Sequence, residues 1–165
     1  MPERSYRSGN GYTMIEMLIV VVIMGILMAI SLPSYLQWRQ NAEYRDAAQN
    51  ILSILRNAKG RSIAANRQYL VTFEPVNSRY GMQQGNRQES TVWTDPAIQP
   101  ITDWTVLNQD VRVGPAGPSI IVEWNPNGTV SLPAPVTVLI TDKTAVTKYT
   151  ITVIQSGRIS LKAGS

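Results

Sequence analysis

The feature that most constrains this chain is an apolar run of 21 residues, Tyr12 to Leu32, which contains a single charged residue, Glu16. As a helix the run is about 31 Å long, close to the hydrocarbon thickness of a bilayer. It predicts one membrane-spanning helix, because later apolar runs such as Val136 to Ile140 are only strand-sized. A charge at the bilayer centre costs about 2.5 to 3.5 kcal/mol, so Glu16 is a candidate functional residue that needs a partner. The alternative is an ordinary signal anchor with an incidental glutamate.

The residues before the run favour a cut on its N-terminal side. Arg4 and Arg7 against Glu3 give a short, mildly positive leader, which is typical of bacterial targeting segments. A secretory signal would be cut after its apolar core, where Ala29-Ile30-Ser31 offers only a poor cleavage site. A cut after Gly11 would instead keep the apolar run at the N-terminus of the mature chain.

The segment from Gly11 to Ile23 resembles a type IV prepilin signature, and Pro33 matches the proline that these helices usually carry. Tyr12 and Met14 replace the family's usual phenylalanine and leucine but keep their size and apolar character. The resemblance implies cleavage by a prepilin peptidase between Gly11 and Tyr12, followed by N-methylation of Tyr12. It also implies a single-pass inner-membrane protein with its C-terminal domain in the periplasm, in keeping with the positive leader. The protein would later enter a filament at the cell surface.

Composition excludes several classes of function. The 165 residues include no cysteine and no histidine, which removes disulfides, cysteine nucleophiles, histidine bases and thiolate zinc sites. The remaining serine, lysine and carboxylate residues stand in no recognisable catalytic spacing, and no phosphate-binding loop is present. We therefore expect neither an enzyme nor a cofactor or metal site. Beyond the anchor there is room for one domain of about 100 residues.

Residues 34–66 keep a helical period. Apolar residues recur at steps of three and four, with charged and amide residues between them; the apolar set is Tyr44, Ala47, Ala48, Ile51, Leu52, Leu55 and Ala58. The pattern predicts an amphipathic helix that lays this stripe on the domain. Pro33, at its junction with the anchor, removes a backbone donor and can kink the helix.

From Arg67 onward the period changes to two, which is typical of antiparallel sheet. Asn125-Pro126-Asn127-Gly128 predicts a tight turn, and this interpretation is preferred over a glycosylation acceptor at Asn127-Gly128-Thr129. The predicted strands are around Tyr69 to Glu74 and at Ser119 to Trp124, Thr129 to Leu132, Val136 to Thr141, Lys148 to Gln155 and Arg158 to Lys162.

Two later segments narrow the resemblance. Ile121 to Gly128 resembles the strand and turn of the GspH, FimT and FimU group, and Thr150 to Ile159 resembles that group's closing hairpin. The expected fold is α+β and pilin-like, with a long N-terminal helix packed on a C-terminal antiparallel β-sheet domain. The expected divisions are a leader at 1–11, a transmembrane and assembly helix at 12–33, its amphipathic half at 34–66 and a β domain at 67–165.

The region from Gly85 to Pro118 is rich in proline, glycine and polar residues and predicts long loops. Trp93 and Trp104 cap the edge of the core in the preferred interpretation, and take part in recognition in the other. The acidic residues of the region, Asp95, Asp103 and Asp110, are too widely spaced to resemble a calcium loop.

The resemblance implies a minor type IV pilin that acts in initiating pilus assembly near the tip. Its partners would be major and other minor pilins, contacted through the N-terminal helix. Glu16 would meet the positively charged amine of a neighbouring subunit's Tyr12 in a low-dielectric bundle and so set the register between subunits. Because the two residues are four apart, pairing within one helix is the alternative.

Two other functions fit the residues. One is the equivalent minor pseudopilin of a type II secretion system, with the same anchor. The other is a DNA-binding minor pilin for natural transformation, similar to FimT, whose Gly-Arg-x-Arg motif is here Gly157-Arg158-Ile159-Ser160, followed by Lys162. The motif lacks one arginine, and charges that only solvate a strand edge are the alternative.

Overall fold

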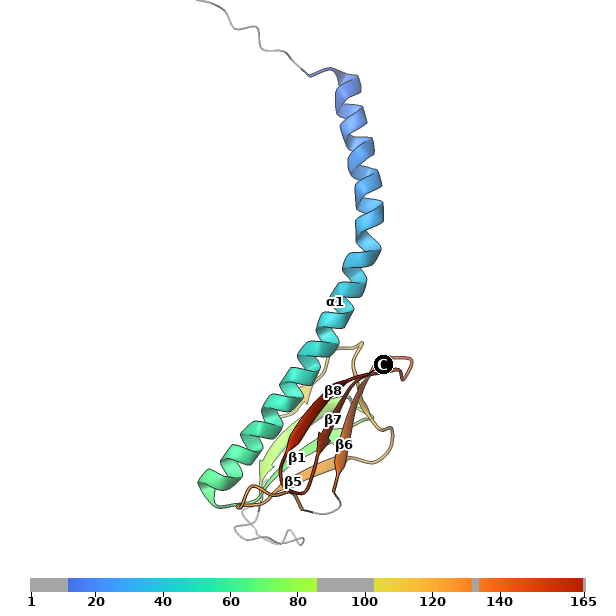
Figure 1. Cartoon of the computed structure of the whole chain (residues 1–165). Helices are drawn as coiled ribbons and strands as arrows, with labels where there is room; N and C mark the ends of the chain where they lie inside the picture. The colour runs from blue at the N-terminus through green and yellow to red at the C-terminus, as the bar shows by residue number, and fades with distance from the viewer. Residues whose placement is uncertain (1–11, 86–102, 132–133, 165) are drawn as a thin grey trace, which may run out of the picture. The chain divides into compact units, whose positions relative to one another are not determined.

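The computed structural model describes residues 12–85, 103–131 and 134–164, which form two compact units that meet between Arg39 and Gln40. The described residues form one helix and eight strands: α1 Met14–Ala65, β1 Tyr69–Glu74, β2 Arg79–Gln84, β3 Thr105–Val106, β4 Arg112–Gly114, β5 Ile120–Trp124, β6 Val136–Thr141, β7 Thr147–Val153 and β8 Ile159–Ala163 (Figure 1).

The first unit consists of the N-terminal part of α1. Its residues from Tyr12 to Arg39 are all exposed, and the helix continues through Pro33. Proline has no N–H to donate to the carbonyl four residues earlier. Two residues before Pro33, the Ser31 hydroxyl donates to the Leu27 carbonyl at 2.8 Å.

In the second unit the rest of α1 packs on the strands, and the predicted apolar stripe is confirmed. Its seven residues are all buried, together with Ser62. Ile51 and Leu55 are fully enclosed among the strands' inward side chains. Each such side chain contributes about 1.5 to 3 kcal/mol by leaving water, so the stripe fixes this half of the helix to the domain.

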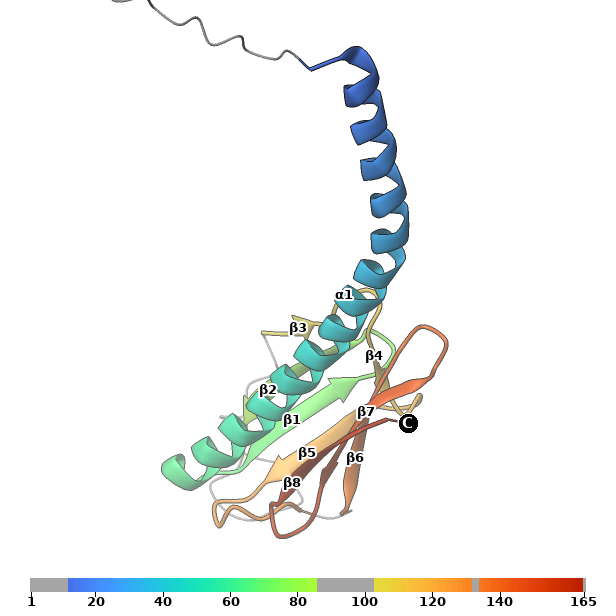
Figure 2. The ribbon, with the colours of Figure 1, turned by 45° about the horizontal axis from the view of Figure 1, so that its top comes forward.

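The strands form two antiparallel four-stranded sheets. Their orders are β3-β2-β1-β5 and β4-β6-β7-β8, and Figure 2 shows β2, β1 and β5 of the first sheet side by side. Inward residues alternate with outward ones, as in β6, where Val138 and Ile140 are buried and Thr137 and Leu139 are only partly so. The inner faces of both sheets and the helical stripe share one core, with Phe73 and Trp124 among its largest side chains.

Most of the strand predictions are confirmed, but three points are corrected. The segment Thr129 to Leu132 was wrong as a strand, because only Val130 forms a single bridge, to Trp124, and Leu132 lies outside the described residues. Its backbone bonds go to different partners: Val130 N–H donates to Gln155 O and Ser131 N–H to Glu123 O.

The loop prediction for Gly85 to Pro118 missed β3 and β4, which lie within it. These short strands pair with β2 and β6, and β6 is distant in the sequence. β2, which lies before this region, was not predicted either. It pairs with β1 along its whole length, from Glu74 opposite Arg79 to Tyr69 opposite Gln84.

Two glycines hold the turns of the domain together. Gly128 closes the predicted Asn125–Gly128 turn, where its N–H donates to Asn125 O at 2.8 Å and its φ is 79°. Gly157 has a φ of 75°, and a Cβ there would lie 2.0 Å from Gly128 O. Only glycine fits this contact between two turns.

Candidate assembly interface

The helix that carries Glu16 begins with a side-chain cap. Glu16 N–H donates to the Thr13 hydroxyl at 3.3 Å and to the Thr13 carbonyl at 3.1 Å. Thr13 therefore satisfies one of the N–H groups that every helix start leaves without an intrahelical partner. The sequence signal was Thr-x-x-Glu, half of a capping box, and our sequence interpretation missed it.

The same position favours the Glu16 carboxylate. Glu16 lies in the first turn of α1, where the helix dipole stabilises a negative charge by about 0.3 to 1 kcal/mol at an exposed site. Tyr12 precedes the first helical residue, Met14. The two residues are thus not one turn apart on a continuous helix in this chain.

Past Glu16, α1 presents apolar side chains in every direction. None of the large hydrophobic side chains from Met17 to Leu32 is buried, and the least exposed, Val20, has 47% of its surface accessible. The helix is long and apolar enough to cross a membrane. Soluble monomers rarely expose apolar surface of this extent, so this helix needs lipid or other helices around it.

The predicted site residues fall into separate places. Tyr12, Glu16 and Pro33 all belong to the first unit, whereas Arg158 and Lys162 belong to the second. Gly11 lies outside the described residues. The roles given to these residues stay predictions.

Arg158 and Lys162 lie on the closing hairpin and are both exposed. Ile159 and Leu161 pack against the core, so Ser160 and Lys162 point to the other face of β8. Opposite them on β7 are Thr152 and Thr150. The two cations therefore border a face rich in hydroxyl groups.

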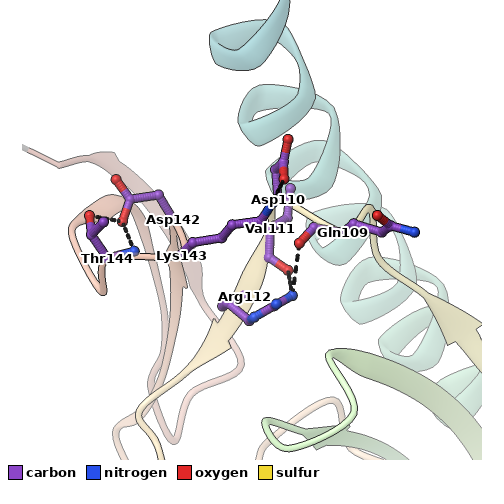
Figure 3. Close-up of polar contacts among 7 residues, drawn as sticks. All are labelled: Gln109, Asp110, Val111, Arg112, Asp142, Lys143 and Thr144. Carbon is purple, nitrogen blue, oxygen red and sulfur yellow. Dashed lines mark hydrogen bonds and ion pairs between the residues drawn. The ribbon is translucent and has the colours of Figure 1, made fainter.

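At the other end of the domain, ion pairs join the turn between β6 and β7 to its neighbours. Figure 3 shows the pair between Lys143 and Asp110, which precedes β4. In a second pair, Lys148 Nζ lies 3.3 Å from Asp142 Oδ2. Hydrogen bonds from the Thr144 hydroxyl and the Val146 N–H to Asp142 hold the pKa of this carboxyl at about 2. Asp142 thus stays ionised throughout the physiological range and fixes this turn.

The structure describes some of the tryptophan and acidic residues that the sequence singled out between Gly85 and Pro118. Trp104 is partly buried, directly precedes the edge strand β3 and stacks on the Arg79 guanidinium at 4.2 Å; its role stays a prediction. Trp93 and Asp95 lie outside the described residues. Within 12–85, 103–131 and 134–164, no three acidic residues gather closely enough to hold a metal ion.

The N-terminal part of the chain is similar to known proteins. Residues 6–32 match the family model of the prokaryotic N-terminal methylation motif. A fimbrial protein of Pseudomonas aeruginosa is 30% identical over 74 residues, which cover 45% of this chain and 47% of the relative. The chain thus spans about half the length of the curated relatives it matches.

The fold is shared with solved minor subunits. The minor pseudopilin EpsH from the type 2 secretion system of Vibrio cholerae matches with a TM-score of 0.53 at 19% identity, over 73% of this chain and 97% of EpsH. The type IV minor pilin FimU of Pseudomonas aeruginosa matches with a TM-score of 0.54 at 17% identity, over 73% of this chain and 89% of FimU. Escherichia coli GspH matches with a TM-score of 0.54 at 12% identity, over 75% of this chain and 90% of GspH.

The chain therefore combines the N-terminal methylation motif with a fold that it shares with a minor pseudopilin and a type IV minor pilin. The likeness to FimU and GspH covers about three quarters of this chain at 17% and 12% identity, so it concerns the fold. The chain is GspH/FimU-like in fold, and its residues 6–32 match the methylation motif.

Proposed function

We propose that this chain is a minor subunit of a type IV pilus that helps to initiate assembly near the pilus tip. The observation that carries the proposal is the uncovered apolar helix with one carboxylate in its first turn, which lies within the segment that matches the methylation motif. A surface of this kind is covered by lipid before assembly and by neighbouring subunit helices after it. Its partners would be the major and other minor pilins.

Processing and topology belong to the same proposal. A prepilin peptidase cuts between Gly11 and Tyr12, and the new Tyr12 amine is N-methylated. The anchor crosses the inner membrane once, with the leader arginines in the cytoplasm and the β domain in the periplasm. Mass spectrometry of the chain from pili tests this, since it should begin with N-methyl-Tyr12; a chain that retains its leader would contradict it.

The role of Glu16 is to set the register between subunits. In the dry interior of a helix bundle, its carboxylate pairs with the Tyr12 amine of a neighbouring chain, and leaving either charge unpaired there is costly. The start of the helix at Met14 supports pairing between chains over pairing within one chain, since it takes Tyr12 out of the helical i, i+4 position. Crosslinking residue 12 to residue 16 in assembled filaments distinguishes the two: a subunit dimer supports the proposal, and a crosslink only within one chain contradicts it.

The second candidate is the corresponding minor pseudopilin of a type II secretion system. The fold match to EpsH, itself a minor pseudopilin of such a system, favours it. A deletion strain separates the two candidates. Loss of twitching motility with normal secretion of exoproteins supports the pilus, and the reverse result supports the secretion system.

DNA binding during natural transformation is a further activity that the β domain could add. The exposure of Arg158 and Lys162 on one hairpin favours it, as does the charge of residues 34–165, where 13 Lys and Arg face 9 Asp and Glu. A gel shift with the fragment 34–165 tests it. A salt-sensitive shift supports binding, and no shift at low salt contradicts it.

A further inference from the structure

Two exposed aromatic side chains follow the apolar run at its C-terminal end. Tyr35 and Trp38 are three residues apart, so they lie on the same face of α1. Their ring centroids are 6.1 Å apart, and 58% and 66% of their surfaces are accessible. Arg39, the first charged residue after Glu16, comes next in the chain.

The distance of this pair from the apolar run fits the thickness of a bilayer. Tyr35 lies about 4.5 Å and Trp38 about 9 Å beyond Leu32, at 1.5 Å per residue. The helix from its first residue, Met14, to Trp38 is about 36 Å long, against about 30 Å for the hydrocarbon and about 40 to 45 Å for the whole bilayer. Tyr35 and Trp38 thus stand at the depth of the polar headgroups, beyond the C-terminal end of the apolar run.

We propose that Tyr35 and Trp38 bind the lipid–water interface on the periplasmic side and fix the depth of the helix before assembly. Amphipathic rings prefer this region because they bury an apolar body while the hydroxyl or indole N–H stays near water. This inference rests on the membrane insertion in the proposed function.

The anchored depth has a consequence for Glu16. Glu16 lies about 33 Å from Trp38 along the axis, slightly more than the hydrocarbon thickness. Because Trp38 stands about 9 Å beyond the hydrocarbon, Glu16 lies about 6 Å inside the cytoplasmic edge of the hydrocarbon. The preference of the carboxylate for water draws the helix toward the cytoplasm, and the aromatic pair opposes this movement.

The test uses the natural absence of cysteine, because each cysteine introduced into the full-length chain is then unique. The chain is reconstituted in phosphatidylethanolamine–phosphatidylglycerol vesicles, and the labelling rate of single cysteines by a water-soluble maleimide is measured. Ile23→Cys reports insertion and Ser34→Cys reports the depth of the periplasmic boundary. Both are compared with and without the double change Tyr35→Ala and Trp38→Ala.

We expect the helix to sink toward the cytoplasmic side without its anchors, because this moves Glu16 out of the hydrocarbon and toward water. Labelling at Ser34→Cys should then fall about tenfold, the effect of a 1.4 kcal/mol shift in the depth equilibrium. Leu36→Ala, which removes an exposed aliphatic side chain from the same segment, is the matched control and should leave the rate unchanged.

Three results would overturn the inference or its basis. An unchanged rate at Ser34→Cys in the double variant refutes the anchoring role of the aromatic pair. An equal fall in Leu36→Ala refutes it too, because apolar area alone would then set the depth. Rapid labelling of Ile23→Cys in the otherwise unchanged chain contradicts membrane insertion itself, and with it the localisation in the proposed function.

Discussion

Replacing Lys59 by methionine should loosen the helix from the β domain. Lys59 Nζ donates to the Gly157 carbonyl at 2.8 Å and lies 5.7 Å from the centre of the Trp124 ring. The charged hydrogen bond is worth about 1.5 to 3 kcal/mol, toward the lower end for a half-buried group, and the cation–π contact adds about 0.5 kcal/mol. Methionine keeps the apolar stem, so Lys59→Met should cost about 2 kcal/mol of unfolding free energy.

Thermal unfolding of the fragment 34–165, followed by circular dichroism, measures the loss. For a domain of this size about 2 kcal/mol lowers the Tm by about 8 °C. Lys143→Met is the matched control, because it removes the same charge from an exposed pair and should cost about 0.5 kcal/mol or less. Equal Tm values for the two variants would refute the claim that Lys59 ties the helix to the closing hairpin.

Three other predictions follow from the domain. Gly157→Ala should prevent the two turns from meeting, since its Cβ would lie 2.0 Å from Gly128 O, and the fragment should lose its cooperative unfolding transition; an unchanged Tm would contradict this. Because the pKa of Asp142 is depressed to about 2, its ionised form stabilises the fold above about pH 4 and the stabilisation is lost as the pH falls toward 2. The Tm difference between wild type and Asp142→Asn should therefore shrink between pH 4 and pH 2, and a constant difference would count against it. If the fragment shifts DNA, changing Arg158 and Lys162 to alanine should weaken the shift and reduce its salt dependence, with Tm unchanged; equal binding by the double variant would exclude this hairpin as the site.

The sequence predicted the elements whose side chains carry a clear period. The stripe from Tyr44 to Ala58 is buried as expected, and β6 has the predicted bounds, because Val136 to Thr141 alternates in both burial and residue type. The long apolar helix was equally clear, because 21 consecutive residues contain only one charge and the helix of the structure begins at Met14.

The missed elements depend on pairing between distant residues. β2 contains Gly81 and three polar residues, so its strand character comes from pairing with β1 rather than from propensity. β4 has only three residues and exists because it pairs with the end of β6. The wrong strand at Thr129 shows the reverse case, since Asn127 Oδ1 accepts hydrogen bonds from both the N–H and the hydroxyl of Thr129 and holds it in the turn.

For the candidate interface, the sequence pointed to Glu16 but not to the cap that supports it. The prediction followed from the cost of a charge in an apolar run, whereas the Thr13 cap is a local hydrogen bond that the structure shows. The lipid-facing pair Tyr35 and Trp38 also went unremarked, because neither residue is unusual alone. Their meaning comes from their contact and from their distance to the end of the run.

The most direct test of the central claim is the incorporation of Glu16→Ala into filaments. The variant is expressed in the deletion strain beside Met17→Ala, which shortens an exposed apolar side chain of the same helix turn. Sheared filaments and membranes are then quantified by immunoblot. We expect Glu16→Ala to be processed and present in the membrane but lost from the filaments, while Met17→Ala is incorporated. Incorporation of Glu16→Ala at the wild-type level would contradict the claim that this carboxylate sets the register between subunits.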